Sequence, residues 1–119
     1  MKVTDVKMET YRWQRPKPIR NGRYIYPTAG LDIIKIETDE GINGIGLSGG
    51  VQEAEDIGRS ILGHLKQYVI GQDPFDTERI WEDMWQPKLI GRRGITTRVI
   101  SGIDIALWDI KGKVANRPV

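Results

Sequence analysis

One stretch of the sequence concentrates positive charge and aromatic rings. Between Arg12 and Arg23 there are five Lys or Arg residues and no acid. The cations are Arg12, Arg15, Lys17, Arg20 and Arg23, and the neighbouring aromatic residues are Trp13, Tyr24 and Tyr26. Guanidinium groups bind carboxylate or phosphate through paired N–H donors, and aromatic rings shield such contacts from water. The stretch is therefore predicted to be an anion-binding flap, and the alternative is a solvated basic loop, because surface charge runs are common.

Other residue types with catalytic potential form no recognisable constellation. His64 is the only histidine, and it is expected to be a structural residue on a helix. The acids, including Glu53–Asp56 and Asp109, suit helix ends and i,i+4 ion pairs better than a magnesium site, which needs carboxylates from separate elements. Gly44 and Gly46 lie within a predicted strand, so they are expected to permit a bulge or a close approach rather than to bind nucleotide.

Length and composition limit the range of protein classes. With 119 residues and 39% hydrophobic content, the chain is predicted to form a single domain over residues 1–119. The net charge of +2 excludes a general polycation, so nucleic-acid binding by the basic stretch is the weaker alternative. The absence of cysteine excludes disulfides and thiolate zinc sites. The absence of cysteine also favours a cytoplasmic location, and because no apolar run reaches the roughly 20 residues that span a bilayer, we expect no membrane partner.

The first part of the chain has the pattern of strands. Alternation from Lys2 to Arg12 predicts a half-buried strand. Leu31–Thr38 and Ile42–Leu47 flank the turn sequence Asp39–Gly41, which predicts a β-hairpin. The segment Trp13–Gly30 contains three prolines and is predicted to be a long ordered loop, because proline removes backbone donors.

The second part of the chain has the pattern of helices. Apolar residues at three- and four-residue spacing predict helices over Ala54–Val69, around Ile80–Trp85 and over Ile100–Val114. Four boundary signals accompany them: Gly71 as a C-cap, Asp76 as an N-cap, Pro87 as a stop and Gly91–Gly94 as a loop. Strands followed by helices predict an α+β fold, in which helices cover one face of a three-stranded antiparallel meander.

Three longer stretches are similar to a known family. They are IETDEGINGIG (Ile36–Gly46), IGQDPFDTERIWEDMW (Ile70–Trp85) and SGIDIALWDIKGKVANRPV (Ser101–Val119). Over essentially its whole length the chain resembles the N-terminal capping domain of the mandelate racemase and muconate lactonizing enzyme branch of the enolase superfamily. Members commonly end the third strand with a glutamate after Gly-x-Gly, where this chain has Leu47-Ser48.

The resemblance implies a fold, a partner and a chemistry. The fold is three antiparallel strands and a helical bundle, which closes over the C-terminal face of a (β/α) barrel that this chain lacks. The chemistry is abstraction of the proton alpha to a carboxylate, with Mg²⁺ stabilising the enediolate. Metal ligands and catalytic bases lie on the barrel, so no catalytic residue, metal ligand or cofactor site is expected in this chain, which alone should be inactive.

The resemblance also implies substrate contacts in this chain. The loops after the first and third strands touch the substrate in the family, which here are Arg15–Tyr26 and Ser48–Val51. The expected substrate-binding residues are Arg15, Lys17, Arg20, Asn21, Tyr24, Tyr26 and Ser48. The expected partners are a small-molecule carboxylate, the chain's own C-terminal barrel and further copies in a homo-oligomer.

Several activities fit this resemblance. The cationic and aromatic flap favours a polyhydroxylated acid, so an acid-sugar dehydratase is the first expectation. A racemase, epimerase or cycloisomerase would use the same enolate chemistry. A noncatalytic binding or assembly module is the alternative from another class, and it predicts self-association through an exposed apolar surface that includes Ile103, Leu107, Trp108 or Ile110.

Overall fold

The computed structural model consists of a three-stranded sheet followed by three helices, and it describes residues 1–49, 55–85 and 94–119. The strands are β1 (Val3–Asn21), β2 (Tyr24–Thr38) and β3 (Gly44–Ser48), and the helices are α1 (Glu55–Val69), α2 (Thr77–Met84) and α3 (Ile95–Ala115). The sheet order is β1-β2-β3, and both strand pairs are antiparallel. The predicted α+β meander with helices after it is confirmed. None of the helices in the described ranges has the length and apolar character needed to cross a bilayer.

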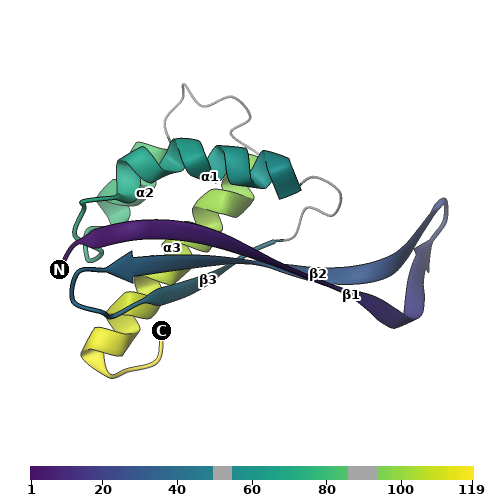
Figure 1. Ribbon diagram of the computed structural model, residues 1–119, viewed down its shortest axis with the longest axis horizontal. Helices are drawn as coiled ribbons and strands as arrows, with labels where there is room; N and C mark the ends of the chain where they lie inside the picture. Colours follow the sequence, from purple (N-terminus) through teal and green to yellow (C-terminus); the bar gives the residue numbers. More distant parts are fainter. Residues whose placement is uncertain (50–54, 86–93) are drawn as a thin grey trace.

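The core lies between one face of the sheet and the helices. Figure 1 shows α3 running behind the strands, with α1 alongside β1. Alternate residues of the strands point to this side, so Val6, Ile34 and Ile36 are fully buried while Lys7 and Lys35 remain on the other face. β1 also contributes Val3, and the helices contribute the other side chains of the core, which are Leu62, Leu65, Val69, Ile80, Met84, Val99, Ile100, Ile103, Ala106, Leu107 and Ile110. Three of the four residues expected on an exposed apolar surface are thus in the core.

The correction has a simple physical cause. Ile103, Leu107 and Ile110 follow helical spacing, and that stripe of α3 packs on the sheet within this domain. Trp108 is 44% exposed and Ile105 is 45% exposed, because they lie on the other side of the helix. The predicted apolar face of α3 is therefore correct, but the domain's own sheet covers it.

Glycines allow β3 and α3 to come into backbone contact. A Cβ added to Gly44 would overlap the carbonyl oxygen of Ala106, and one added to Gly46 would overlap that of Gly102. On the helix side, a Cβ on Gly102 would lie 2.8 Å from the Ile34 side chain. The prediction that these strand glycines permit a close approach is confirmed.

The predicted loop Trp13–Gly30 is wrong, because this segment forms paired strands. The β1–β2 ladder runs from Gln14↔Thr28 to Asn21↔Tyr24 with a register shift between Gln14 and Ile19. Two prolines fall within this irregular part of β1, and β1 is an edge strand, so their missing N–H donors break few ladder bonds. The result is a long two-stranded arm that extends beyond the helices (Figure 1).

The helix boundaries follow the predicted signals with one difference. Gly71 follows α1 with φ of 82°, the left-handed conformation expected of a C-terminal glycine. Asp76 occupies the N-cap position of α2, but its side chain makes no capping hydrogen bond and instead accepts from Arg79 at 2.6 Å. The predicted stop at Pro87 and most of the predicted loop Gly91–Gly94 lie outside the described residues.

Candidate functional site

The outer part of the β1–β2 arm, residues 14–28, carries six of the seven expected substrate-binding residues, and we call it the hairpin tip. The two strands turn at Gly22 and Arg23, where Gly22 has φ of 27°. Large apolar side chains on the tip remain exposed, with Ile19, Tyr24 and Ile25 each more than half exposed. Such exposure of rings and cations on a projecting element marks a surface that is built for contact rather than for the core.

The strand register divides the tip into two faces. Asn21 pairs with Tyr24 and Ile19 pairs with Tyr26, so these side chains share one face, whereas Arg20 pairs with Ile25 on the other. The Tyr24 and Tyr26 rings lie 6.5 Å apart, and Asn21 Nδ2 donates to Tyr26 Oη at 3.5 Å. Alternation along β2 places both tyrosines on the face that carries Asp32 and Ile34 further along the strand. Asn21, Tyr24 and Tyr26 therefore form one polar and aromatic surface.

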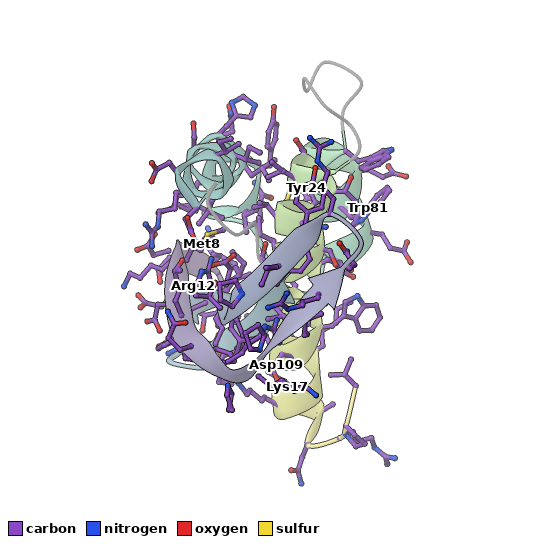
Figure 2. All side chains as sticks on the ribbon, turned by 90° about the vertical axis from the view of Figure 1, so that its right-hand side faces the viewer. Met8, Arg12, Lys17, Tyr24, Trp81 and Asp109 are labelled. Atoms are coloured by element: carbon purple, nitrogen blue, oxygen red, sulfur yellow. The ribbon has the colours of Figure 1, made fainter. Side chains whose placement is uncertain are left out.

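The cations of the tip differ in the contacts that they make with the rest of the protein. Arg15 Nε donates to the Thr28 carbonyl at 2.9 Å, which ties its side chain across the hairpin. Within residues 1–49, 55–85 and 94–119, Lys17, Arg20 and Arg23 form no ion pair. In Figure 2 Tyr24 lies near the upper edge of the hairpin and Lys17 near the lower edge. The tip thus carries both cations that form no ion pair with the described residues and a pair of aromatic rings, which suits an anion with several polar groups.

Arg12 does not belong to this free set of cations, which corrects its inclusion in the basic stretch. Its Nη2 lies 3.0 Å from Asp32 Oδ1 and 2.8 Å from Glu55 Oε1. Burial pulls the pKa of Arg12 down, and the hydrogen bonds to Glu55 and Asp32 more than offset this, so the pKa lies above its ordinary value. The sequence could not show this, because Glu55 is 43 residues away along the chain.

Ser48 is the last residue of β3 and lies apart from the tip. Only 3% of it is exposed, and its Oγ donates to the Arg98 carbonyl on α3 at 3.3 Å. The hydroxyl therefore helps to join β3 to α3, and a contact between Ser48 and substrate stays a prediction. Of the other residues of the expected turn, Gly50 and Val51 lie outside the described residues.

The acidic residues of the described ranges do not gather into a metal-binding cluster, and some of them have structural partners. No group of three or more His, Asp or Glu side chains within these ranges could hold a metal ion. Asp109 Oδ2 accepts from the Ile45 backbone N–H at 2.8 Å and pairs with Lys113 at 2.7 Å, which confirms the predicted i,i+4 pair. His64 is exposed on α1, where its ring meets Tyr68 edge-on at 6.0 Å.

A groove between α2 and α3 went unnoticed in the sequence. It has a volume of about 300 Å³ and is lined by Thr77, Glu78, Trp81, Glu82, Asp104 and Trp108. Burial raises the pKa of Asp104, and the charge of Lys111 partly opposes that shift. Trp81 lies across α3 from α1, on the outer surface of the helices (Figure 2). The two tryptophans were the available signal, since only one side of each helix can face the core.

Comparisons with known proteins place this architecture in a family. The family model of the N-terminal domain of mandelate racemase and muconate lactonizing enzyme matches residues 3–119. The chain therefore belongs to the enolase superfamily as an N-terminal domain of the mandelate racemase and muconate lactonizing type. The resemblance carried by the three sequence stretches is confirmed.

Relatives show how the domain is used elsewhere. A D-galactonate dehydratase of Cronobacter sakazakii is 42% identical over 89 residues, which are 72% of this chain and 22% of that protein. A protein of Caldivirga maquilingensis, provisionally named an L-rhamnonate dehydratase, is 37% identical over 91 residues, which are 76% of this chain and 22% of that protein. The chain thus spans about a fifth of the length of these relatives.

A solved structure shows the same fold. A racemase of Streptomyces coelicolor with bound magnesium matches with a TM-score of 0.85 and 29% identity, over 95% of this chain and 32% of that one. In these relatives the matched domain is one part of a larger enzyme.

Proposed function

We propose that this domain caps the active site of a magnesium-dependent enzyme that removes the proton alpha to a carboxylate, with the hairpin tip enclosing the substrate. The proposal rests on one observation, the cations and the Asn21, Tyr24 and Tyr26 surface on an arm that projects beyond the folded body. A carboxylate suits the guanidinium donors, and hydroxyl groups suit the amide and phenol groups.

The favoured substrate is an acid sugar and the favoured reaction is its dehydration. Two relatives carry the names of galactonate and rhamnonate dehydratases, and both of these substrates are polyhydroxylated carboxylates. Dehydration removes the proton next to the carboxylate and expels hydroxide from the neighbouring carbon, and the resulting enol becomes a keto acid. Racemisation is the second candidate, because a similar structure is that of a racemase.

This chain would supply binding and exclusion of water rather than proton transfer. A magnesium ion, such as the one bound in the racemase structure, would stabilise the negative charge that develops in such a reaction, but no described residues of this chain form a cluster that fits it. Arg20 and its neighbours would hold the anion, and the tyrosine rings would cover it. We therefore assign no catalytic step to the residues of this domain.

The test uses the complete enzyme with Arg20→Gln and Tyr24→Phe, assayed on a panel of sugar acids. We expect KM to rise about tenfold in at least one variant, because a charged or polar contact with the substrate is lost. The affinity for magnesium should be unchanged. Arg79→Gln is the matched control, because Arg79 is an exposed arginine on α2. Because Arg20 and Tyr24 lie on opposite faces of the tip, the variant that responds identifies the face that meets substrate.

Two results would contradict the proposal. Unchanged kinetics in both variants would remove the tip from substrate binding. Inversion of configuration at the alpha carbon without loss of water would show racemisation in place of dehydration. NMR in deuterated solvent would reveal it through incorporation of deuterium at that carbon.

A further inference from the structure

Three elements meet in a cluster of charges at the root of the hairpin tip. Arg12 belongs to β1, Asp32 to β2, and Glu55 is the first residue of α1. Arg12 Nη2 bonds both oxygens of Asp32, at 3.0 and 3.3 Å, and Arg12 Nε donates to Glu55 Oε1 at 2.9 Å. One guanidinium therefore joins the two arm strands to the start of a helix that is distant in sequence. Figure 2 shows Arg12 on the side of the hairpin on which α1 lies.

The cluster is fitted to the shape of a guanidinium. Arg12 Nη1 donates to the Tyr11 carbonyl at 2.9 Å and to the Leu31 carbonyl at 3.4 Å, so each nitrogen has an acceptor. Any side chain at position 30 would overlap the Arg12 guanidinium, so Gly30 leaves room for it. Asp32 is only 3% exposed, and a carboxylate this deeply buried requires compensation. A lysine would keep the charge but could not donate in all these directions.

The cluster also sits where the sheet narrows. The last pair between β2 and β3 is Asp32↔Ser48, so beyond Asp32 the arm has only β1 and β2. A two-stranded ribbon is marginal by itself and has freedom to swing about its root. A second link to α1 lies next to the cluster, because Arg59 Nη2 donates to Thr10 Oγ1 at 3.2 Å.

We infer that Arg12 is a positioning residue, which uses its contact with Glu55 to fix the direction of the hairpin tip relative to α1. The ion pair with Asp32 joins only strands that are already paired, whereas the pair with Glu55 reaches outside the sheet. The link between Arg12 and Glu55 itself follows from the contacts of this domain. Its consequence for catalysis rests on the proposed function, since a tip held in one direction presents its polar surface at one place without a loss of conformational freedom on binding.

The experiment measures the direction of the tip by electron spin resonance between two spin labels. The sequence has no cysteine, so Arg23→Cys at the turn and Gly63→Cys on α1 supply the labels, and Gly63 has open space around it. We expect Glu55→Ala and Arg12→Lys each to broaden the distance distribution at least about twofold, because alanine removes the acceptor of Arg12 Nε. Glu55→Ala leaves the buried Arg12–Asp32 pair in place, so this variant should still fold, and Glu55→Ala with Arg59→Gln should broaden the distribution further.

Lys66→Gln is the matched control. Lys66 pairs with Asp5 at 3.1 Å, which is also a contact between α1 and β1, but it lies at the other end of the helix. Its removal should cost similar stability and leave the tip distribution unchanged. A distribution that stays narrow in Glu55→Ala and in the double variant would overturn the inference, and so would equal broadening in Lys66→Gln.

Kinetics of the complete enzyme separate this inference from the proposed function. We expect Glu55→Ala to raise KM several-fold with little change in kcat, whereas a general loss of stability would reduce the active fraction and leave KM unchanged. Broadening together with a raised KM supports both ideas. Broadening with unaltered kinetics supports the positioning role of Arg12 and contradicts substrate binding by the tip.

Discussion

The hairpin tip and the β3–α3 contact are the two extremes of this domain. At the tip, Tyr24 is 58% exposed and Ile19 is 51% exposed, whereas Ile103 and Ala106 of α3 are completely buried. Glycines serve opposite purposes in the two regions. Gly22 adopts a positive φ that turns the chain back into solvent, while Gly46 removes a side chain so that a helix can touch a strand.

The difference separates a closely packed region of this small domain from an exposed one. Backbone contact and close packing make the β3–α3 region intolerant of added atoms. The tip contributes few buried contacts, so its residue types are free to serve a ligand. The charged cluster around Arg12 lies at the root of the tip and joins it to α1.

The largest expected effect is a loss of stability from a change at the backbone contact between β3 and α3. Gly46→Ala places a methyl group against the Gly102 carbonyl oxygen, so either α3 or β3 must move. We expect a loss of about 3 kcal/mol or more in the free energy of unfolding, measured with urea. Gly63→Ala is the control, because Gly63 is on α1 with open space around it, and it should be neutral or stabilising. Tolerance of alanine at position 46 would show that the contact is looser than the structure has it.

The next effect concerns the hydrogen bond that holds the same contact. Asp109→Ala removes the acceptor of the Ile45 N–H and the partner of Lys113. We expect a loss of about 1–3 kcal/mol, because the hydrogen bond has a charged acceptor. Asp109→Asn can still accept from Ile45 and should lose less than the alanine variant, again in urea unfolding. Equal losses in both variants would assign the effect to the ion pair rather than to the strand.

A smaller effect depends on pH and lies on β1 near the start of the chain. A hydrogen bond from Lys66 lowers the pKa of Asp5 below its ordinary value of 3.8. A carboxylate with a lowered pKa stabilises the folded state fully above its unfolded pKa, and this contribution disappears as the pH falls through the folded pKa. Asp5→Asn should therefore have a lower melting temperature than the parent protein at pH 6, and the two melting temperatures should converge as the pH falls below 3.8 and through the lowered pKa of Asp5. A difference that is constant with pH would show that Asp5 acts without its charge.

The smallest effect on stability is expected at the tip. Replacement of residues 15–27 by Asn-Gly would join Gln14 to Thr28, which face each other across the ladder. We expect the free energy of unfolding to change by less than about 1 kcal/mol, because most of the removed side chains are exposed. The complete enzyme should lose affinity for its substrate. A large loss of stability would mean that the tip is part of the folding unit, and the contrast between the two regions would fail.

Much of the fold was readable from local patterns. Alternation along β1 and β2 and the helical stripe of α3 identified the elements, because side-chain periodicity depends only on backbone geometry. Pro16 and Pro18 led to the wrong prediction of a loop. The effect of a proline depends on whether its strand has a neighbour on each side, and β1 is an edge strand. The basic stretch was recognised as a candidate site, but its division into two faces depended on the register.

The sequence by itself determined the order of strands and helices, the apolar face of each element and the positive charge of the tip. Only the tertiary structure decided which charges remain available. Arg12 and Arg20 are the same residue type eight positions apart, yet Arg12 meets Glu55 across 43 residues while Arg20 lies on the projecting tip. Local patterns follow from the chain's own geometry, whereas ion pairs of this kind follow from packing that brings distant segments together.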